Sequence, residues 1–213
     1  MKLNKSQIVA AGIILLSFLI SAWFWPQMPE RMATHWGISG QVNGYMPKFW
    51  GLFFVPILLA LLGLLFWVFP RLDPLKANIA QFRKYYDGFI VAVLLFMIIV
   101  HIQVILWNRG LRIPPNLILP LGVGILFYYI GIISEKSKRN WWIGIRTPWT
   151  LSSDRVWERT HRLGAKLFKI AGGIIALGLF FPKYSFYFII IPALGLVAFA
   201  YAYSYAEYRK ETQ

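Results

Sequence analysis

The residue types best suited to chemistry in this chain lie in one short stretch, where Asp154, Glu158 and His161 follow one another. On a helix, at about 100° per residue, they fall within about 60° of one another on one face. Glu-x-x-His on a helix is one element of di-metal carboxylate sites, which also need ligands from other helices. The simpler interpretation is that Asp154 caps the helix and Glu158 pairs with Arg162, while His161 faces lipid headgroups. We favour the simpler interpretation, and we predict no metal, no cofactor and no catalytic residue.

Two further histidines are candidates for a binding role. His101 and Gln103 interrupt an apolar run, and polar groups within a membrane span usually point into the bundle. Because both lie near one end of the run, we favour a structural hydrogen bond between helices over a ligand or proton site. His35 stands beside Trp36 in a turn-rich loop and is a candidate for a binding surface. There is no serine or cysteine nucleophile with a placed base, no His-Glu-x-x-His helix and no phosphate-binding glycine loop. These observations favour a protein that is not an enzyme.

The chemically rich stretch at residues 140–163 begins as a loop and continues as a helix. Proline disfavours helical geometry at Thr147, and Ser152 and Ser153 then provide caps for a new helix. Five basic residues of that helix fall within about 80° of one another. They are Arg155, Arg159, Arg162, Lys166 and Lys169. This pattern predicts an amphipathic cytoplasmic helix at the headgroups, placed before a fifth membrane span and continuing into it.

Composition excludes an ordinary soluble domain. Hydrophobic residues make up 58% of the 213 residues and charged residues only 14%. The net charge of +14 would by itself suggest a nucleic-acid ligand, but the basic residues lie between long apolar runs. We therefore read the charge as membrane topology and predict no direct nucleic-acid binding. The absence of cysteine excludes disulfides and thiolate chemistry.

The apolar runs predict an all-α integral membrane protein with six transmembrane helices. The predicted spans are residues 8–25, 49–69, 89–106, 117–133, about 170–181 and 185–205. The first run ends in Trp23, Phe24 and Trp25, which indicate an interfacial belt and a retained span rather than a cleaved signal. We treat residues 1–213 as a single polytopic domain, with two spans in 1–70 and four in 71–213.

Several local features refine this prediction. Asn43-Gly44 is a tight-turn signal, and Gly37 and Gly40 allow further backbone reversals, which together favour a short hairpin or compact loop between the first two spans. Pro70 is expected to end the second span. Ala198, Ala202 and Ala206 form a small-residue ridge on the sixth span, for which we favour packing inside the bundle over a dimer contact.

The basic residues predict the orientation. Roughly three times as many Lys and Arg residues lie on the side of the termini as on the other side. The minority side carries Arg31, Lys48, Arg109, Arg112 and Lys183. The positive-inside rule places both termini and the 140–163 loop in the cytoplasm and the His35-Trp36 loop outside. The expected location is the cell membrane.

Two motifs carry a resemblance to a known family. The segment Ile143-Gly-Ile-Arg-Thr-Pro-Trp-Thr-Leu-Ser152, followed by Asp154, Val156 and Trp157, resembles the hallmark of the SdpI family of immunity proteins against a sporulation-delaying toxin. The outer loop is similar to the domain of unknown function that commonly forms the N-terminal half of that family. The matching loop residues are Pro29, Glu30, His35, Trp36, Gly37, Ser39, Gly40, Gly44, Tyr45 and Lys48.

The resemblance implies a membrane protein that protects its cell from a secreted, membrane-active peptide. In the best-known family member the protein is also a receptor, which holds a transcriptional repressor at the membrane when toxin is present. The expected partners are thus the lipid bilayer, a hydrophobic toxin peptide and a cytoplasmic repressor. The functional core implied for this chain comprises Gly144, Arg146, Thr147, Pro148, Trp149, Thr150 and Trp157, with His35, Trp36, Gly40 and Gly44 in the outer loop.

Other function classes remain open from the residues themselves. A small-molecule or lipid transporter is favoured by His101, Gln103 and the glycines in the spans, although no internal repeat is visible. An intramembrane enzyme would require a metal on Asp154, Glu158 and His161. For the Arg146 motif, the alternative to a functional role is that it only turns the chain and holds it at the membrane.

Overall fold

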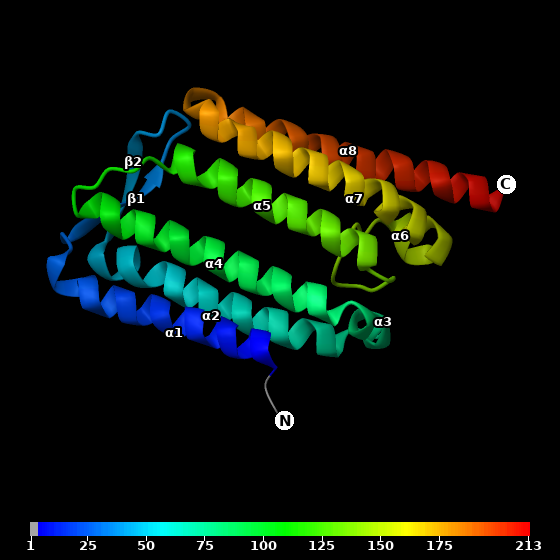
Figure 1. The fold of residues 1–213 in the computed structure, drawn as a ribbon, viewed down its shortest axis with the longest axis horizontal. Coiled ribbons are helices and arrows are strands. Elements are labelled where there is room, and N and C mark those ends of the chain that lie inside the picture. Colours follow the sequence, from blue (N-terminus) through cyan, green and yellow to red (C-terminus); the bar gives the residue numbers. More distant parts are fainter. Residues whose placement is uncertain (1–3) are drawn as a thin grey trace.

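The computed structural model describes residues 4–213, which form a bundle of long helices (Figure 1). Six helices are long and apolar enough to cross a membrane. They are α1 (Lys5–Phe24), α2 (Lys48–Leu72), α4 (Arg83–Asn108), α5 (Pro115–Lys136), α7 (Asp154–Leu177) and α8 (Ser185–Thr212). At 1.5 Å per residue, each of them reaches across a hydrocarbon core of ~30 Å. The predicted multi-pass helical membrane protein is confirmed.

Short elements connect the long helices. Two helices of one or two turns and three 3-10 turns lie in the connections. They are α3 (Lys76–Gln81), α6 (Pro148–Ser152), η1 (Trp25–Gln27), η2 (Gly178–Phe180) and η3 (Pro182–Tyr184). Strands β1 (Arg31–Trp36) and β2 (Val42–Pro47) form a two-stranded antiparallel hairpin between α1 and α2. The expected hairpin is therefore present, and it adds a small β element to an otherwise helical fold.

The hairpin turns at Gly37 and Gly40, which the sequence offered as further reversals, and not at Asn43-Gly44. The chain reverses at residues 37–41, where Gly40 has φ +76° and Gly37 N–H donates to Gln41 O at 2.9 Å. Asn43 and Gly44 lie instead within β2, beside an irregularity in the strand register. A Cβ added at Gly44 would lie 2.8 Å from His35 Cβ, so this glycine permits close strand approach rather than a turn.

The six long helices form two groups. Helices α1, α2 and α4 pack against one another, as do α5, α7 and α8, and the two groups meet along α4 and α5. Both termini lie at one end of the bundle, which we call the termini end, and the hairpin lies at the other, the hairpin end (Figure 1). The larger apolar core belongs mainly to the first group and includes Leu59, Phe82, Tyr86, Leu94 and Ile133.

Several helices extend beyond the apolar runs that predict them. Pro70 does not end α2, which continues to Leu72. Proline has no N–H to donate to the carbonyl four residues earlier, and that carbonyl, Phe66 O, accepts the Tyr86 hydroxyl at 2.9 Å instead. Helix α4 begins six residues before the apolar run, where Arg83 pairs with Asp87 at 2.6 Å. The basic stripe and the fifth span are one continuous helix, α7. The amphipathic segment is therefore the first half of the spanning helix, which confirms the predicted continuation of the basic helix into the fifth span.

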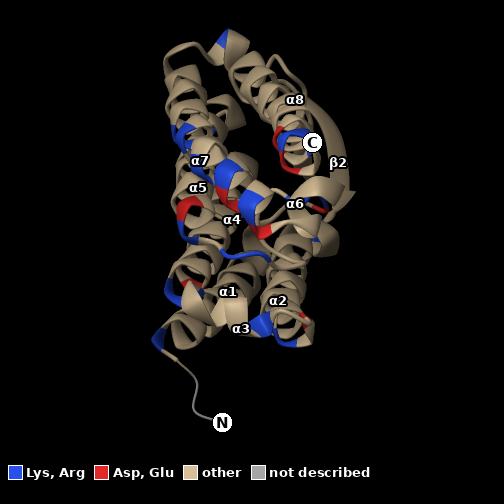
Figure 2. Cartoon of the chain, turned by 90° about the vertical axis from the view of Figure 1, so that its right-hand side faces the viewer, with Lys and Arg blue, Asp and Glu red and all other residues tan. Residues whose placement is uncertain are grey.

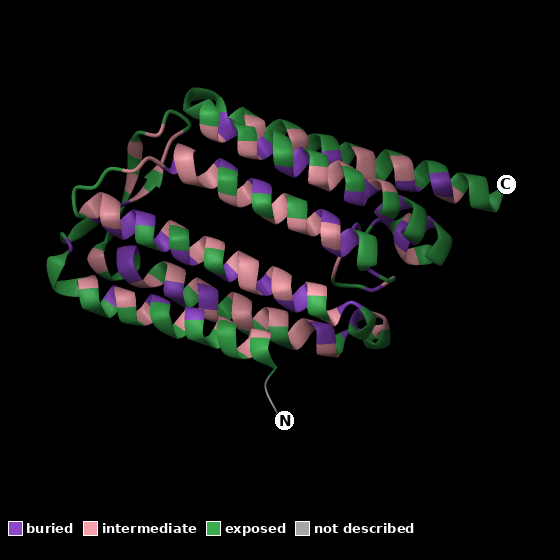
Figure 3. Cartoon of the chain, in the orientation of Figure 1, coloured by how far each residue is buried: buried purple, intermediate pink, exposed green. Residues whose placement is uncertain are grey.

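The outer faces of the bundle are apolar and exposed (Figure 3). Large side chains such as Leu15, Leu61, Ile99 and Leu194 point outwards, as expected for contact with lipid. The small-residue ridge of α8 belongs to this exterior, because Ala198, Ala202 and Ala206 are all exposed. The expectation that this ridge packs inside the bundle is wrong: α8 turns Leu196, Ser204 and Glu207 inwards instead.

The basic residues segregate between the two ends of the bundle as the sequence suggested. Figure 2 looks onto the termini end and shows Lys and Arg gathered on α7 and the neighbouring helix ends. Arg31 and Lys48 border the hairpin at the opposite end, while Lys2 lies outside the described residues. The cytoplasmic placement of the termini end stays a prediction.

Orientation can be tested with single-cysteine variants, because the chain has no cysteine. Ser39 in the hairpin turn and Ser152 in α6 are both exposed. With the termini inside, a membrane-impermeant maleimide added to intact cells should label the Ser39→Cys variant and not the Ser152→Cys variant. Permeabilised cells are the control, in which both should react. Labelling of only the Ser152→Cys variant in intact cells would invert the topology.

The tightest helix contact provides a stability test. A Cβ added at Gly172 of α7 would lie 2.6 Å from Gly124 O and 2.7 Å from Tyr128 N on α5. Gly172→Ala should therefore lower the free energy of unfolding in mild detergent by about 1–3 kcal/mol. The adjacent Gly173→Ala is the control, because nothing lies within 4 Å of its added Cβ. Equal stability of the two variants would contradict the close approach of α5 and α7.

Candidate functional site

Residues 137–153, here called the cap segment, cross the termini end of the bundle between α5 and α7. Asn140 organises its first turn and is fully buried. The Asn140 side-chain amide donates to Lys138 O and Ile143 O at 2.8 and 3.0 Å. Its Oδ1 accepts the Trp142 and Ile143 N–H groups at 2.9 and 2.6 Å. One side chain thus supplies the hydrogen bonds that a helix or sheet would otherwise provide.

The first helix group holds the cap segment through the connection between α2 and α3. Asp73 is 1% exposed, and its Oδ2 accepts the Trp141 N–H at 2.8 Å. Asn78 donates from Nδ2 to Arg139 O at 2.7 Å. Trp142 stacks on Phe69 of α2, with ring centroids 3.9 Å apart and planes inclined by 6°. The cap segment is therefore bound to helices more than sixty residues away in the sequence.

The second helix group holds the other end of the cap segment. Thr147 caps α6 in a reciprocal pair, in which Thr147 N–H donates to Thr150 Oγ1 at 2.9 Å and Thr150 N–H donates to Thr147 Oγ1 at 3.2 Å. Thr147 Oγ1 also donates to Ser204 Oγ of α8 at 2.9 Å. Trp149 packs on Tyr201 and Tyr205 of the same helix. The Thr-Pro-Trp-Thr motif is thus a short capped helix bound to α8.

His161 joins α7 to the cap segment and is 2% exposed. Its Nδ1 lies 2.9 Å from Trp157 O, a group that only accepts, while its Nε2 lies 2.9 Å from Ile145 N, a group that only donates. These partners require a neutral ring with the proton on Nδ1. The ring also stacks on Trp157 at 3.9 Å. Gly144, at φ +117°, permits this approach, because an added Cβ would lie 2.5 Å from His161 Nε2.

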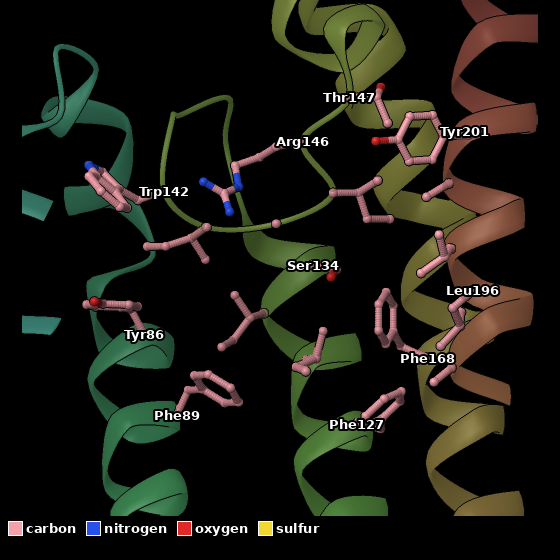
Figure 4. Close-up of a pocket in the computed structure, with 18 of the residues that line it drawn as sticks. Tyr86, Phe89, Phe127, Ser134, Trp142, Arg146, Thr147, Phe168, Leu196 and Tyr201 are labelled. Atoms are coloured by element: carbon pink, nitrogen blue, oxygen red, sulfur yellow. The ribbon is translucent and has the colours of Figure 1, made fainter. Parts of the chain in front are cut away.

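Arg146 is exposed, whereas the residues on either side of it, Ile145 and Thr147, are buried. It donates from Nη1 to Trp141 O at 2.6 Å, which is the only hydrogen bond found for its guanidinium among residues 4–213. A guanidinium carries five N–H donors, so four of them remain available. The side chain stands over a pocket of about 560 Å³ that lies between the two helix groups (Figure 4).

The three residues proposed at the outset for metal chemistry do not converge. Asp154 accepts from Arg139 at 2.7 Å, and Glu158 pairs with Lys138 at 3.1 Å rather than with Arg162. His161 is buried in the cap contact and does not face headgroups. No cluster of three His, Cys, Asp or Glu side chains suited to a metal occurs in the described part of the chain. The three residues lie on one helix as expected, but each side chain bonds a different residue of the cap segment.

The other histidines lie far from the cap segment. His101 Nε2 lies 2.9 Å from Ser21 Oγ of α1, which is the structural bond between helices that the sequence favoured. Ser21 Oγ also donates to Leu52 O at 2.7 Å, so this one hydroxyl of α1 links three helices, α1, α2 and α4. Gln103 donates to Ile113 O at 2.8 Å. Both polar side chains of this span therefore have structural partners.

The predicted outer-loop residues gather in the hairpin. His35 Nδ1 lies 2.5 Å from Asn43 Oδ1, and Trp36 packs edge-on against Trp107 of α4. Sequence reasoning missed Asn108, whose side chain bonds both Ala33 N–H and Ala33 O at 2.8 and 2.9 Å. The outer-loop set and the cap-segment set lie at opposite ends of the bundle and form no common site.

These features define a class: a multi-pass helical membrane protein whose two helix groups are closed at one end by a cap segment that buried polar side chains hold in place. The profile of the SdpI/YfhL protein family matches residues 136–205, which contain the cap segment, and that of a domain of unknown function, DUF1648, matches residues 12–60. The chain therefore resembles the SdpI/YfhL family. It is 27% identical over 207 residues to "Immunity protein SdpI" of Bacillus subtilis (strain 168), covering 97% of each chain. No solved structure matches.

Replacing His161 tests the cap contact. His161→Ala leaves the Ile145 N–H without its acceptor and opens a cavity beside Trp157, which should cost about 2–4 kcal/mol of unfolding free energy. Arg162→Ala is the matched control, because this exposed neighbour makes no ion pair within residues 4–213 and should change stability by about 0.5 kcal/mol or less. Thermal unfolding in detergent measures both, and similar melting of the two variants would refute the contact.

Proposed function

We propose that this protein is an immunity protein that protects its cell from a secreted, membrane-active peptide toxin. The observation that carries the proposal is similarity over nearly the whole chain to a protein named for immunity, with a complete cap segment. A partial match would support only a shared module, whereas coverage of 97% on both sides includes all six spans and the hairpin. The proposal involves no catalytic step and no cofactor.

The cap segment supports a receptor role within this function. It bonds to the first helix group through Asp73 and Asn78 and to the second through Thr147. A ligand that changes the spacing of the two groups must therefore deform the cap segment or break one of these bonds. The bonds of the cap segment would then differ between the ligand-free and the ligand-bound state, as a two-state response requires.

Signalling to a cytoplasmic repressor is the finer part of the proposal. The exposed face of α7 carries Arg155, Arg162 and Lys166, none of which makes an ion pair with another residue in the part of the chain described. Arg159 of the same face is held by Glu207 at 2.6 Å. A basic surface next to the cap segment suits an acidic protein face. Displacement of the cap segment would alter the surface presented there.

A transporter is the second candidate, and the pocket of about 560 Å³ between the two helix groups favours it. Its size is typical of small-ligand sites. A transporter would lower the amount of toxin or substrate associated with cells, whereas an immunity protein that acts by binding would leave it unchanged or raise it. Cell-associated labelled toxin peptide therefore separates the two functions.

The central test is survival. A host without its own immunity protein should survive the sporulation-delaying toxin peptide when it expresses this chain. Arg146→Ala should lose at least about tenfold of that protection, since one charge-assisted contact accounts for such a factor. Its amount in the membrane and its melting temperature should stay near those of the parent, because the side chain is exposed and bonds one loop carbonyl.

Arg155→Ala is the control for the survival test, because it removes an equally exposed arginine of the termini end. It should retain protection, although it is expected to weaken repressor recruitment. Full protection by Arg146→Ala would reduce the motif to a structural turn. Failure of the parent chain to protect would refute immunity against this peptide.

A further inference from the structure

The pocket beneath the cap segment is lined almost entirely by apolar side chains from both helix groups. Phe66 and Phe69 of α2 face it from one side, and Leu196, Val197 and Ala200 of α8 from the other. Much of the wall between these two helices is formed by aromatic side chains, namely Tyr86, Phe89, Phe127 and Phe168 (Figure 4). Water filling so apolar a space would lack hydrogen-bond partners, so its natural occupant is itself apolar.

The pocket opens toward the hydrocarbon. Val197 and Tyr201, which line it, are 56% and 55% exposed on the outer surface of α8. Their neighbour Leu194 is 64% exposed and belongs to the lipid-facing side of the same spanning helix. An apolar chain can therefore enter from the bilayer sideways, between the two helix groups, without crossing water.

Two polar groups lie at the end of the pocket nearest the cap segment. Arg146 offers the four guanidinium N–H groups that Trp141 O does not take. Ser134 of α5 is 2% exposed and lines the pocket, and its oxygen is directed to the pocket in Figure 4.

We propose that this pocket is a lipid site, which binds one acyl chain of an anionic phospholipid from the leaflet at the termini end, with the lipid phosphate on Arg146. The guanidinium fork suits a phosphate, and its place at the mouth of an apolar pocket matches the order of head and chain in a lipid. The volume of about 560 Å³ lies within the range of ligand sites that bury most of a small molecule.

A lipid chain fits this pocket better than a peptide does. A peptide segment brings an N–H and a C=O at nearly every residue, each of which needs a partner away from water. The cap-segment groups beside the pocket are already used: Ile145 N–H bonds His161, and Ile145 O accepts from Thr150. An acyl chain has no such requirement. The lipid site is independent of the proposed immunity function, since it needs no toxin.

Native mass spectrometry of the detergent-purified full chain, titrated with phosphatidylglycerol or phosphatidylcholine, tests the site. One phosphatidylglycerol should bind per chain, about tenfold more tightly than phosphatidylcholine. Arg146→Ala should abolish that preference, whereas Arg155→Ala, which removes an exposed arginine outside the pocket, should keep it. Glycerophosphate, which lacks acyl chains, should not displace the lipid; displacement would reassign the site to a free phosphate.

The pocket itself is tested by filling it. Ala200→Phe, or Ala200→Leu if the larger side chain prevents folding, should remove binding of both lipids, because Ala200 lines the pocket. Ala198→Phe is the matched control on the exposed side of α8 and should bind as the parent does. Equal binding of the two lipids by the parent chain, or unchanged binding by the Ala200 variants, would overturn the proposal. Displacement of bound lipid by the toxin peptide at equimolar amounts would assign the pocket to the peptide instead.

Discussion

The arrangement depends on pairing the backbone of an irregular segment at the edge of the membrane. Residues 137–147 are neither helix nor strand, yet Asn140 and Thr147 in this segment are buried. Backbone groups buried there have no water to bond, so each must find a protein partner. Asn140, Asp73 and His161 supply those partners from three parts of the chain. The cap segment can therefore adopt its path only when both helix groups are in place.

This requirement ties the polar chemistry of the protein to its helix packing. Asp73 accepts the N–H of Trp141 and also that of Leu75, so one carboxylate fixes both the cap segment and the turn that begins α3. Thr147 caps α6 and also bonds α8. Since each group serves two elements, a change in the position of either helix group would also move the exposed Arg146. The proposed lipid pocket, which is lined by both helix groups, lies directly beneath Arg146.

The spans and the family could be predicted from the sequence because both rest on local patterns: apolar length for the spans and a dense motif for the family. Ser153 as a helix cap also followed from local pattern. The partners of Asp154, Glu158 and His161 could not be predicted, because they come from Arg139, Lys138 and Ile145 on a loop whose path is set by distant residues. In the sequence, Asp73 and Asn140 look like ordinary polar loop residues. Their role is visible only when α2 and the cap segment lie side by side. The misplaced hairpin turn has a similar cause, since Asn-Gly signals a turn only when the strand register allows one.

The backbone contact between α5 and α7 has a mechanical consequence. Gly124 and Gly172 bring the two helices so close that an added Cβ at either would lie 2.6 Å from the carbonyl oxygen of the other. Helices packed this closely cannot slide or rotate past each other without steric collision, so α5 and α7 form one rigid unit. A change in the spacing of the two helix groups would therefore leave the α5–α7 pair intact and occur where α4 meets α5. Such a movement would widen or narrow the lateral opening of the pocket.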